Sequence, residues 1–279
     1  MTAPAEATLP AGSRKLTTAW HPDWRLRVRV AEPGRLTTDV YNGQPDPYAR
    51  DAIAVCAPPT ALLPDGKPIA VLCRRVEQAT TDVDGHLGLA AAPKNDLAPR
   101  GRSWTYDQDG QVLTATDPLG RSTRHAYHAR SGADATRGDL QSTTNPAGQT
   151  TTFDRFNAHG QVEQRTDPNG VMTTLAYDAR QRLASRTAAG QTTRYAYNAA
   201  GQLTTTTLPN GAAITNTYDP AQRLVQVEDA VGNKLTYTLD AAGNRIGEQL
   251  QDSGGTPLRT IKRSFDALNR LQSVTGAPK

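Results

Sequence analysis

Few residues in this chain have types and spacings that suggest chemistry. His125 and His128 stand three positions apart, and histidine is a common metal ligand. Residues three apart in a strand point to opposite faces, however, and no cysteine or carboxylate cluster accompanies the pair in the sequence. We therefore interpret both histidines as surface residues and predict no metal site.

Enzymatic chemistry has equally little support. The sequence contains serines and aspartates, but it lacks a Gly-x-Ser-x-Gly elbow and any strand–helix alternation that would hold a Ser/His/Asp triad. It also lacks a P-loop and a dinucleotide-binding fingerprint. We expect a protein without cofactors and without catalytic activity.

The two cysteines, Cys56 and Cys73, are too few for a disulfide scaffold and lack the paired spacing of a zinc site. They flank a turn sequence, Pro64-Asp65-Gly66, and we expect the surrounding residues to form an extra hairpin. The cysteines would then lie nearly opposite each other. A disulfide, if the protein is exported, and two free buried thiols both fit this placement.

The composition limits the class of protein. The chain has 279 residues, of which 37% are hydrophobic and 5% aromatic, so it is too polar for a large core. Its net charge of +4 is scattered without a basic stripe, which argues against nucleic-acid binding. The sequence has no run of about 18 apolar residues, and residues 1–15 lack the apolar stretch of a signal peptide. We predict no membrane span and no signal peptide in this sequence.

An internal repeat organises most of the chain. An aromatic or large apolar residue, which we call the slot residue, recurs at intervals that are mostly 20 or 21 residues. Asp or Asn usually follows it directly, an apolar residue stands six positions after it, and a glycine stands near position fourteen. The slot residues are Trp20, Tyr41, Tyr106, Tyr127, Phe156, Tyr177, Tyr197, Tyr218, Leu239 and Phe265. The residues that define the repeat most clearly are Tyr106, Asp107, Gly120, Tyr127, Phe156, Gly170, Tyr177, Asp178, Leu183, Tyr197, Leu203, Gly211, Tyr218, Asp219, Leu224, Gly232, Asp240, Phe265, Asp266 and Leu271.

Each repeat predicts a β-hairpin. The residues before the slot alternate in polarity, and those after it are rich in threonine and β-branched side chains, so both segments favour strands. Between them, Asp/Asn-x-x-Gly forms a tight turn in which the Asx side chain bonds the downstream backbone. Asp-Pro-x-Gly sequences, such as residues 117–120, form the turn at the other end. We expect the slot residue and the apolar residue six positions later to face each other on one side of the sheet.

Ten slot residues predict roughly twenty strands, which span on the order of 95 Å of sheet at about 4.8 Å per strand. Open twisted sheets rarely exceed about ten strands without curling. The predicted fold class is therefore all-β: a repetitive antiparallel hairpin meander that coils into an open segment of a spiral shell. The slot residues would bury against the next turn of the coil or a lumen. Unpaired strands at both ends of such an array favour aggregation or pairing with neighbouring sequence.

Departures from the period indicate insertions. The apolar residue and the glycine after Tyr127 arrive seven residues late, which places an insertion near residues 131–137. Extra residues near 254–258 delay Phe265, and we expect such slack to lie in turns. The predicted domains are a flexible segment at 1–16, divergent repeats at 17–44, an insertion with a Cys-bearing hairpin and a loop at 45–100, and the repeat array at 101–279.

The repeat resembles the YD repeat of RHS proteins, a family that includes bacterial polymorphic toxins, insecticidal toxin-complex subunits and animal teneurins. Residues 177–183, 218–224 and 265–271, which read YDARQRL, YDPAQRL and FDALNRL, carry the resemblance most clearly. In that family the strands spiral into a hollow β-shell, which in the bacterial toxins encloses a C-terminal toxic domain. The resemblance implies a non-catalytic structural container, secreted or at the cell surface as part of a longer protein. Its implied partners are an enclosed toxin domain or the remaining shell sequence.

Three further expectations follow. Asp117 and Asp167 stand in Asp-Pro-x-Gly motifs similar to the self-cleaving element that follows the array in RHS toxins, but both fall on the regular turn position, so we interpret them as turn residues. The chain ends at Lys279 within what looks like another repeat, so we expect a fragment without core and cargo domains. The alternative function is an extracellular carbohydrate-binding module, because tyrosines such as Tyr195 beside polar side chains suit sugar stacking.

Overall fold

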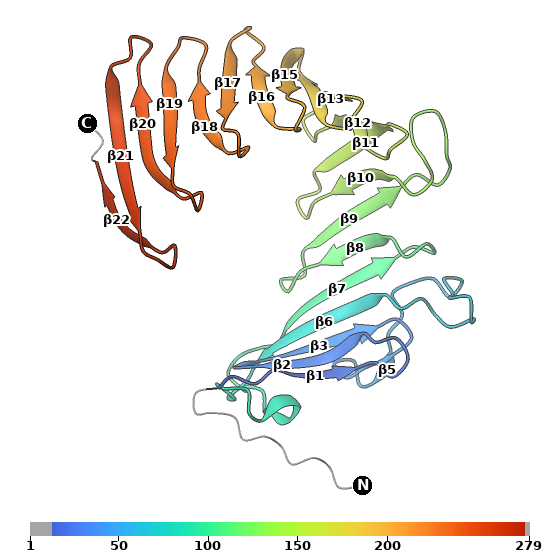
Figure 1. The fold of residues 1–279 in the computed structure, drawn as a ribbon. Helices are drawn as coiled ribbons and strands as arrows, with labels where there is room; N and C mark the ends of the chain where they lie inside the picture. Colours follow the sequence, from blue (N-terminus) through green and yellow to red (C-terminus); the bar gives the residue numbers. More distant parts are fainter. Residues whose placement is uncertain (1–12, 277–279) are drawn as a thin grey trace. The chain divides into compact units, whose positions relative to one another are not determined.

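The computed structural model describes residues 13–276 (Figure 1). The chain divides into two compact units, Met1–Phe153 and Asp154–Lys279. Most of the predicted flexible segment 1–16 lies outside the described residues. The boundary between the units falls inside the predicted array 101–279, and the divisions that we placed at residues 16, 44 and 100 stay predictions.

The first unit holds β1 (Thr17–Trp20), β2 (Arg27–Glu32), β3 (Arg35–Tyr41), β4 (Pro45–Asp46), β5 (Ala52–Ile53), β6 (Leu72–Ala79), the short helix η1 (Gly88–Ala90), β7 (Arg100–Tyr106), β8 (Val112–Thr116), β9 (Ser122–Tyr127), β10 (Leu140–Thr144) and the start of β11 (Thr150–Phe156). The second unit holds β12 (Val162–Thr166), β13 (Met172–Tyr177), β14 (Leu183–Ala188), β15 (Gln191–Tyr197), β16 (Leu203–Thr207), β17 (Ala213–Tyr218), β18 (Leu224–Glu228), β19 (Lys234–Leu239), β20 (Arg245–Gln251), β21 (Pro257–Phe265) and β22 (Leu271–Thr275).

Both units are built from antiparallel strands that mostly pair with their neighbours in the chain. Twenty strands belong to this antiparallel sheet structure, and β4 and β5 form a separate small hairpin. In the described part of the chain the only helix is the three-residue η1, and no helix there is long and apolar enough to span a membrane. The predicted all-β hairpin meander is confirmed.

In five repeats the strand register sets the slot residue opposite the apolar residue six positions later. A register shift precedes the slot residue in each pair, which marks a bulge where the hairpin turn begins. Residues that pair across an antiparallel ladder share one face of the sheet, as the sequence predicts for these two positions. The pairs are Tyr106–Val112, Tyr177–Leu183, Tyr197–Leu203, Tyr218–Leu224 and Phe265–Leu271.

The two faces of the second unit differ in chemistry. One face carries rows of threonine, and the paired Thr187 and Thr192 place their hydroxyl oxygens 2.8 Å apart. The opposite face, which we call the slot face, carries the slot residues together with Leu, Ile and Val side chains. Among residues 154–276 only Thr173 and Ile261 are buried, as expected for a single sheet layer. The thin core that the composition predicts is confirmed for this unit.

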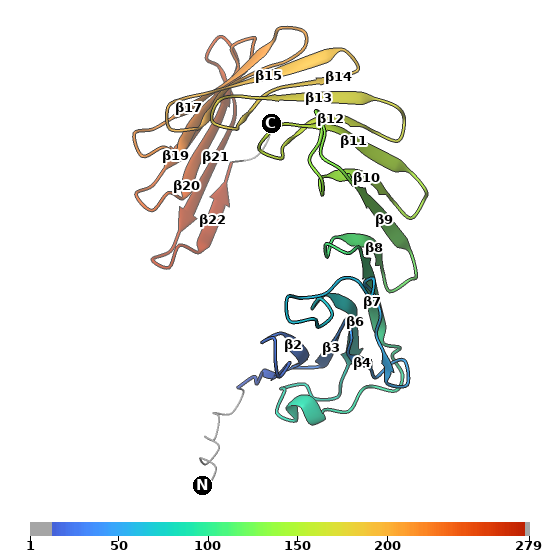
Figure 2. The ribbon, with the colours of Figure 1, turned by 90° about the vertical axis from the view of Figure 1, so that its right-hand side faces the viewer.

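Buried side chains in the first unit gather on β2, β3 and β6, where the segment between β3 and β6 covers them. The Tyr48 hydroxyl donates to the side-chain oxygen of Gln78 on β6 at 2.7 Å. The Arg74 guanidinium lies 5.5 Å from the centre of the Tyr48 ring and pairs with Asp46 at 3.1 Å. Strand β4 consequently lies beside β6 (Figure 2). The buried hydrophobic residues on these three strands are Val30, Ala31, Leu36, Val40, Tyr41, Cys73 and Val76.

The predicted Cys-bearing hairpin does not form. Cys73 lies in β6, which pairs with β3 and β7, whereas Cys56 lies in a loop after β5. Between residues 54 and 71 no strand forms, and pairing across the turn is limited to the Leu62–Pro68 bridge and backbone hydrogen bonds from Leu63 to Lys67 and from Ile69 to Ala61. Four prolines within residues 58–68 explain the difference, because proline cannot donate to a strand ladder. The two cysteines nevertheless form a disulfide, with Cα atoms 5.4 Å apart.

The two later insertions are accommodated in different ways. Residues 128–139 form a loop between β9 and β10, as predicted, and Arg137 in that loop pairs with Asp109 at 2.7 Å. The extra residues before Phe265 lengthen β20 and β21 to seven and nine residues instead. The turn between these strands keeps the usual length, with the Asp252 N–H donating to the Thr256 carbonyl. The expectation that slack lies in turns is therefore wrong at this position, where added residues extend the ladder.

Candidate functional site

The slot tyrosines tie each hairpin to the one before it. Each phenol hydroxyl donates a hydrogen bond of 2.8 to 3.0 Å to a backbone carbonyl, which in four of the six cases belongs to the apolar residue six positions after the preceding slot. The donor–acceptor pairs are Tyr41–Arg27, Tyr106–Leu72, Tyr127–Val112, Tyr177–Val162, Tyr197–Leu183 and Tyr218–Leu203.

These carbonyls need a side-chain donor because the backbone ladder stops short of them. The pairing between β14 and β15 ends at Ser185 and Arg194, two residues before the Leu183 carbonyl. The Tyr197 hydroxyl reaches that carbonyl at 2.9 Å and extends the pairing by one bond. A strand end left without a partner would be costly wherever water is excluded. The tyrosine therefore joins the two strands of neighbouring hairpins at the point where their backbone pairing has ended.

The hairpin turns are held by the residue that follows the slot. The Asp178 Oδ1 atom accepts hydrogen bonds from the backbone N–H groups of Arg180 and Arg182, at 2.9 and 3.0 Å. The Asp178 N–H in turn donates to the Arg182 carbonyl. The fourth residue of such a turn has a left-handed backbone, which Gly201 supplies at φ +90° and which Gln181 adopts at φ +64°. The Asx turn predicted from the sequence is present.

Several turns at the opposite end of the hairpins share this geometry, whereas β14 and β15 are joined by a two-residue turn at 189–190. At the other end the Asp117 Oδ1 atom accepts from the N–H groups of Leu119 and Arg121, and Gly120 has φ +78°. Asp167 accepts in the same way from the N–H groups of Asn169 and Val171. Both aspartates are thus engaged as turn residues. The predicted glycines Gly120, Gly170, Gly211 and Gly232 all have positive φ.

The residue four positions after the turn Asp or Asn is matched to it. An amide partners an amide, and a carboxylate mostly partners a guanidinium or an amide donor, so each side-chain bond has one donor and one acceptor. Asn bonds Gln in the turns at Asn145, Asn157 and Asn198; Asp bonds Arg in those at Asp117, Asp178, Asp219 and Asp266; Asp bonds Asn in those at Asp229 and Asp240.

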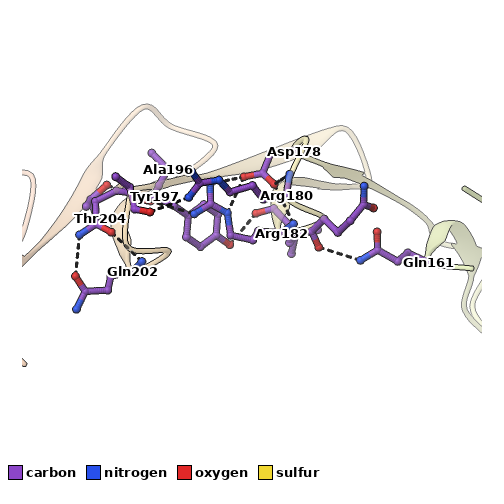
Figure 3. Close-up of polar contacts among 12 residues, drawn as sticks. Gln161, Asp178, Arg180, Arg182, Ala196, Tyr197, Gln202 and Thr204 are labelled. Atoms are coloured by element: carbon purple, nitrogen blue, oxygen red, sulfur yellow. Dashed lines mark hydrogen bonds and ion pairs between the residues drawn. The ribbon is translucent and has the colours of Figure 1, made fainter. Parts of the chain in front are cut away.

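The side chain four positions after the turn Asp or Asn also reaches the turn of the next repeat. We call the row of turns that begin at Asn157, Asp178, Asn198, Asp219, Asp240 and Asp266 the linked turn edge. Within the second unit each of these turns bonds the following one at 2.6 to 3.4 Å, as Figure 3 shows for the row from Gln161 to Gln202. The links run from Gln161 to Gln181, from Arg182 to Asn198, from Gln202 to Gln222, from Arg223 to Asp240 and from Asn244 to Asn269.

Arg182 illustrates how much one such residue joins. Its guanidinium bonds the Asp178 carboxylate at 2.6 and 2.8 Å, and its Nη1 atom donates to the Asn198 carbonyl. The guanidinium carbon also lies 4.4 Å from the centre of the Tyr197 ring (Figure 3). Arginine suits this position because its planar group can bond a carboxylate and stack on an aromatic ring together. One side chain thus connects a turn, the next turn and the next slot residue.

The protonation states favour this bonding at neutral pH. The Arg182 side chain lowers the pKa of the Asp178 carboxyl, and the backbone N–H of Arg223 does the same for the pKa of Asp219. Burial raises the pKa of the Tyr127 and Tyr177 phenols. The turn carboxylates are consequently ionised acceptors, while the slot phenols remain protonated donors.

The residues first considered for chemistry are not brought together. The His125 Nδ1 atom lies 3.0 Å from the Thr143 hydroxyl, and the His128 Nε2 atom lies 3.5 Å from the Phe153 carbonyl. No group of three or more potential metal ligands occurs in residues 13–276. Tyr195 is half-buried on β15 opposite Thr206. Metal binding, catalysis and sugar binding gain no geometric support from these positions, and the expectations about them stay predictions.

Sequence reasoning identified the slot and turn residues but missed their partners. The residues four positions after the turn Asp or Asn, such as Gln202 and Arg182, were not singled out as contacts. A signal was present, because Asn is followed by Gln and Asp by Arg or Asn at this spacing in most turns. The tyrosine–carbonyl bonds carry no such signal, because every residue has a carbonyl.

The RHS Repeat family model matches residues 136–171, 156–190, 177–213 and 218–257. Residues 136–213 and 218–257 of this chain are thus RHS repeats. No curated protein sequence matches it.

Solved structures show the same fold at low identity. The TcdB2-TccC3-Cdc42 crystal structure matches with a TM-score of 0.62 and 17% identity over 95% of this chain. The TcdB2-TccC3-TEV structure matches with a TM-score of 0.57 and 17% identity over 96% of this chain. The structure of TcdB2-TccC3 without its hypervariable C-terminal region matches with a TM-score of 0.56 and 16% identity over 95% of this chain. This chain spans 13% of the length of each matched chain. The likeness therefore shows a shared fold over a small part of each of these longer chains.

Proposed function

We propose that this chain is a non-catalytic wall segment of an RHS-type β-shell, a container that encloses or presents a polypeptide cargo. The observation that carries the proposal is the linkage of every hairpin in the second unit to the next through the linked turn edge. The fold match to the TcdB2-TccC3 structures supports the same reading. In this proposal the chain belongs to a longer protein, which is secreted or displayed at the cell surface.

The architecture suits a wall better than a catalyst. The bonds of the turn edge use up the polar side chains that could otherwise bind or react, because Asp178 and Arg182 satisfy each other and the neighbouring backbone. A single sheet layer with two exposed faces can separate two spaces, whereas it offers little buried volume for a substrate. The disulfide between Cys56 and Cys73 is consistent with an oxidising compartment.

Protease protection tests the proposal. The native gene product that contains this chain would be digested with thermolysin, together with any polypeptide that copurifies, and mass spectrometry would follow cleavage inside and outside residues 1–279. A cargo segment inside an intact wall should survive, and it should become sensitive when the double variant Arg182→Gln/Tyr197→Phe weakens the wall. Equal cleavage of all segments outside 1–279 in both proteins would refute the container.

The carbohydrate-binding alternative predicts a different result. A glycan array would show a dose-dependent hit that Tyr195→Ala abolishes and Tyr127→Phe leaves unchanged. Such a hit, together with an unprotected cargo segment, would replace the container proposal by the binding-module one.

A further inference from the structure

The repeat around Leu239 departs from its neighbours in a way that opens a pocket. Its slot residue is leucine, which has no hydroxyl to donate to the Leu224 carbonyl, the position bonded in four other repeats. The residue opposite Leu239 is Arg245, where five other repeats place Val or Leu. Leu239 is smaller than the usual tyrosine and makes no hydrogen bond to the preceding hairpin. Arg245 introduces a charge where an apolar side chain usually lies.

A shallow, open pocket of about 520 Å³ lies at this place on the surface of the second unit. Its lining is Arg223, Leu224, Leu239, Gly243, Arg245 and Arg263. Two leucines therefore form apolar walls, and three arginines from the turn before β18 and from β20 and β21 supply positive charge. Mixed apolar walls with a few convergent charged groups are typical of ligand sites.

The arginines are held in place and are incompletely compensated. Arg245 stacks on the Tyr237 ring at 3.7 Å, and both Arg245 and Arg263 lie within 3.6 Å of the Glu248 carboxylate. Arg223 is bonded to Asp219 and to the Asp240 carbonyl. The Nη1 atom of Arg263 is buried and has no hydrogen-bond partner, on a side chain only 24% exposed. Burying an unpaired guanidinium nitrogen is unfavourable, so a rotation of the Arg263 side chain that brings this nitrogen to an incoming acceptor would gain a hydrogen bond.

From this arrangement we propose that the pocket binds a carboxylate of an acidic polypeptide segment, in other words a Glu or Asp side chain whose methylene groups lie against Leu224 and Leu239. The pocket already holds Glu248 between two guanidiniums, which shows that their spacing suits a carboxylate. The carboxylates of Asp219 and Glu248 offset two of the three arginines and leave one positive charge. A single further negative charge matches it, whereas a phosphate dianion exceeds it. The site does not depend on the container proposal.

Titration with short peptides tests the site. Acetyl-Glu-Glu-Glu-amide would be added to the 279-residue chain at low salt, with acetyl-Gln-Gln-Gln-amide and inorganic phosphate as comparison ligands. The arginine Nε–H signals in NMR spectra and calorimetry would report binding. We expect the glutamate peptide to shift the signals of Arg245 and Arg263 and to bind more tightly than either comparison ligand.

Two variants and one control sharpen the result. Arg263→Gln should weaken binding roughly tenfold, the effect of one charge-assisted hydrogen bond. Leu239→Tyr should abolish binding while the chain stays folded, because tyrosine is the slot residue of neighbouring repeats and fills the pocket. Arg186→Gln removes the same charge from an exposed position on β14 and should change little.

Three outcomes would overturn the proposal. The first is a loss of binding with Arg186→Gln equal to that with Arg263→Gln, which would indicate general charge attraction. The second is unchanged binding in folded Leu239→Tyr. The third is tighter binding of inorganic phosphate than of the glutamate peptide. Circular dichroism of every variant would establish that the chain is folded.

Discussion

The hydroxyl of Tyr197 donates a 2.9 Å hydrogen bond to the backbone carbonyl of Leu183, fourteen residues earlier. This bond crosses from β15 to β14 at the point where their backbone ladder has ended. The slot residue, which defines the repeat in the sequence, thus also joins one repeat to the one before it. Stability in such an array depends on the contacts between neighbouring repeats as well as on each hairpin.

Tyr197→Phe tests this bond. The ring stays, so the change removes only the hydroxyl and should lower the free energy of unfolding by about 1 kcal/mol. Urea denaturation and hydrogen exchange would measure the loss, which should be largest in β14 and β15. Tyr195→Phe, on the same strand but outside the slot, is the control, and an equal loss there would contradict the assigned role.

The matched side chains of the turns predict a rescue. Arg182→Gln removes the ion pair with Asp178 and the guanidinium contact with the Tyr197 ring, and it should destabilise the second unit. Adding Asp178→Asn recreates the Asn–Gln combination found at Asn198 and Gln202 and should restore part of the loss. A double-mutant cycle from thermal melts would show coupling between the two positions; additive losses would disprove the pairing.

A backbone strain predicts a stabilising change. Gln181 has φ +64° where most turns place glycine, and its side-chain Oε1 atom is buried without a partner. Gln181→Gly removes both costs. Glycine loses more backbone entropy on folding than glutamine does, which offsets part of the benefit, so we expect the free energy of unfolding to rise by roughly 0.5–1 kcal/mol. The reverse change, Gly201→Gln, should destabilise. Chemical denaturation of both variants would check the signs, and a loss with Gln181→Gly would show that no relievable strain exists there.

The titration of the turn and slot residues predicts a stability plateau around neutral pH. The pKa of Asp178 is lowered from its usual 3.8, so its contribution is present above that value and is lost as the pH falls through the lower folded pKa. The pKa of Tyr177 is raised from 10.0, so its contribution is present below 10.0 and is lost as the pH rises through the higher folded value. Thermal melts from about pH 2 to about pH 11 would record the loss of stability at both ends of the range. In Asp178→Asn the acid loss should shrink; an unchanged acid limb would remove Asp178 as a source.

The disulfide should matter for the first unit alone. It closes a loop of 17 residues between Cys56 and Cys73, and a loop of that size is worth about 3 kcal/mol. Reduction, or a Cys56→Ser/Cys73→Ser double change, should raise hydrogen exchange in β3 and β6 and leave β13 to β22 unaffected. Uniform destabilisation of both units would show that they unfold as one.

Several features of this fold were predictable from short-range chemistry. The turn at Asp178 is one example, because an Asx side chain bonds backbone two and four residues ahead, and all of those atoms lie within five residues of sequence. The pairing of Tyr197 with Leu203 is another, since a six-residue spacing across a tight turn sets the register. The segment between β3 and β6 was not predictable in this way. Its prolines and its buried Asp46–Arg74 pair depend on which sheet face it packs against.

By itself, the sequence determined the all-β class, the hairpin period, the turns and the RHS resemblance, because these depend on residues close together in the chain and repeated many times. Only the tertiary structure decided which carbonyl each tyrosine bonds, which turn each Gln or Arg reaches, that Cys56 meets Cys73 outside a hairpin, and that Leu239 opens a pocket lined by three arginines. The physical reason is that these contacts join residues some 14 to 40 positions apart. Their partners are selected by how neighbouring strands pack, and no local pattern encodes that choice.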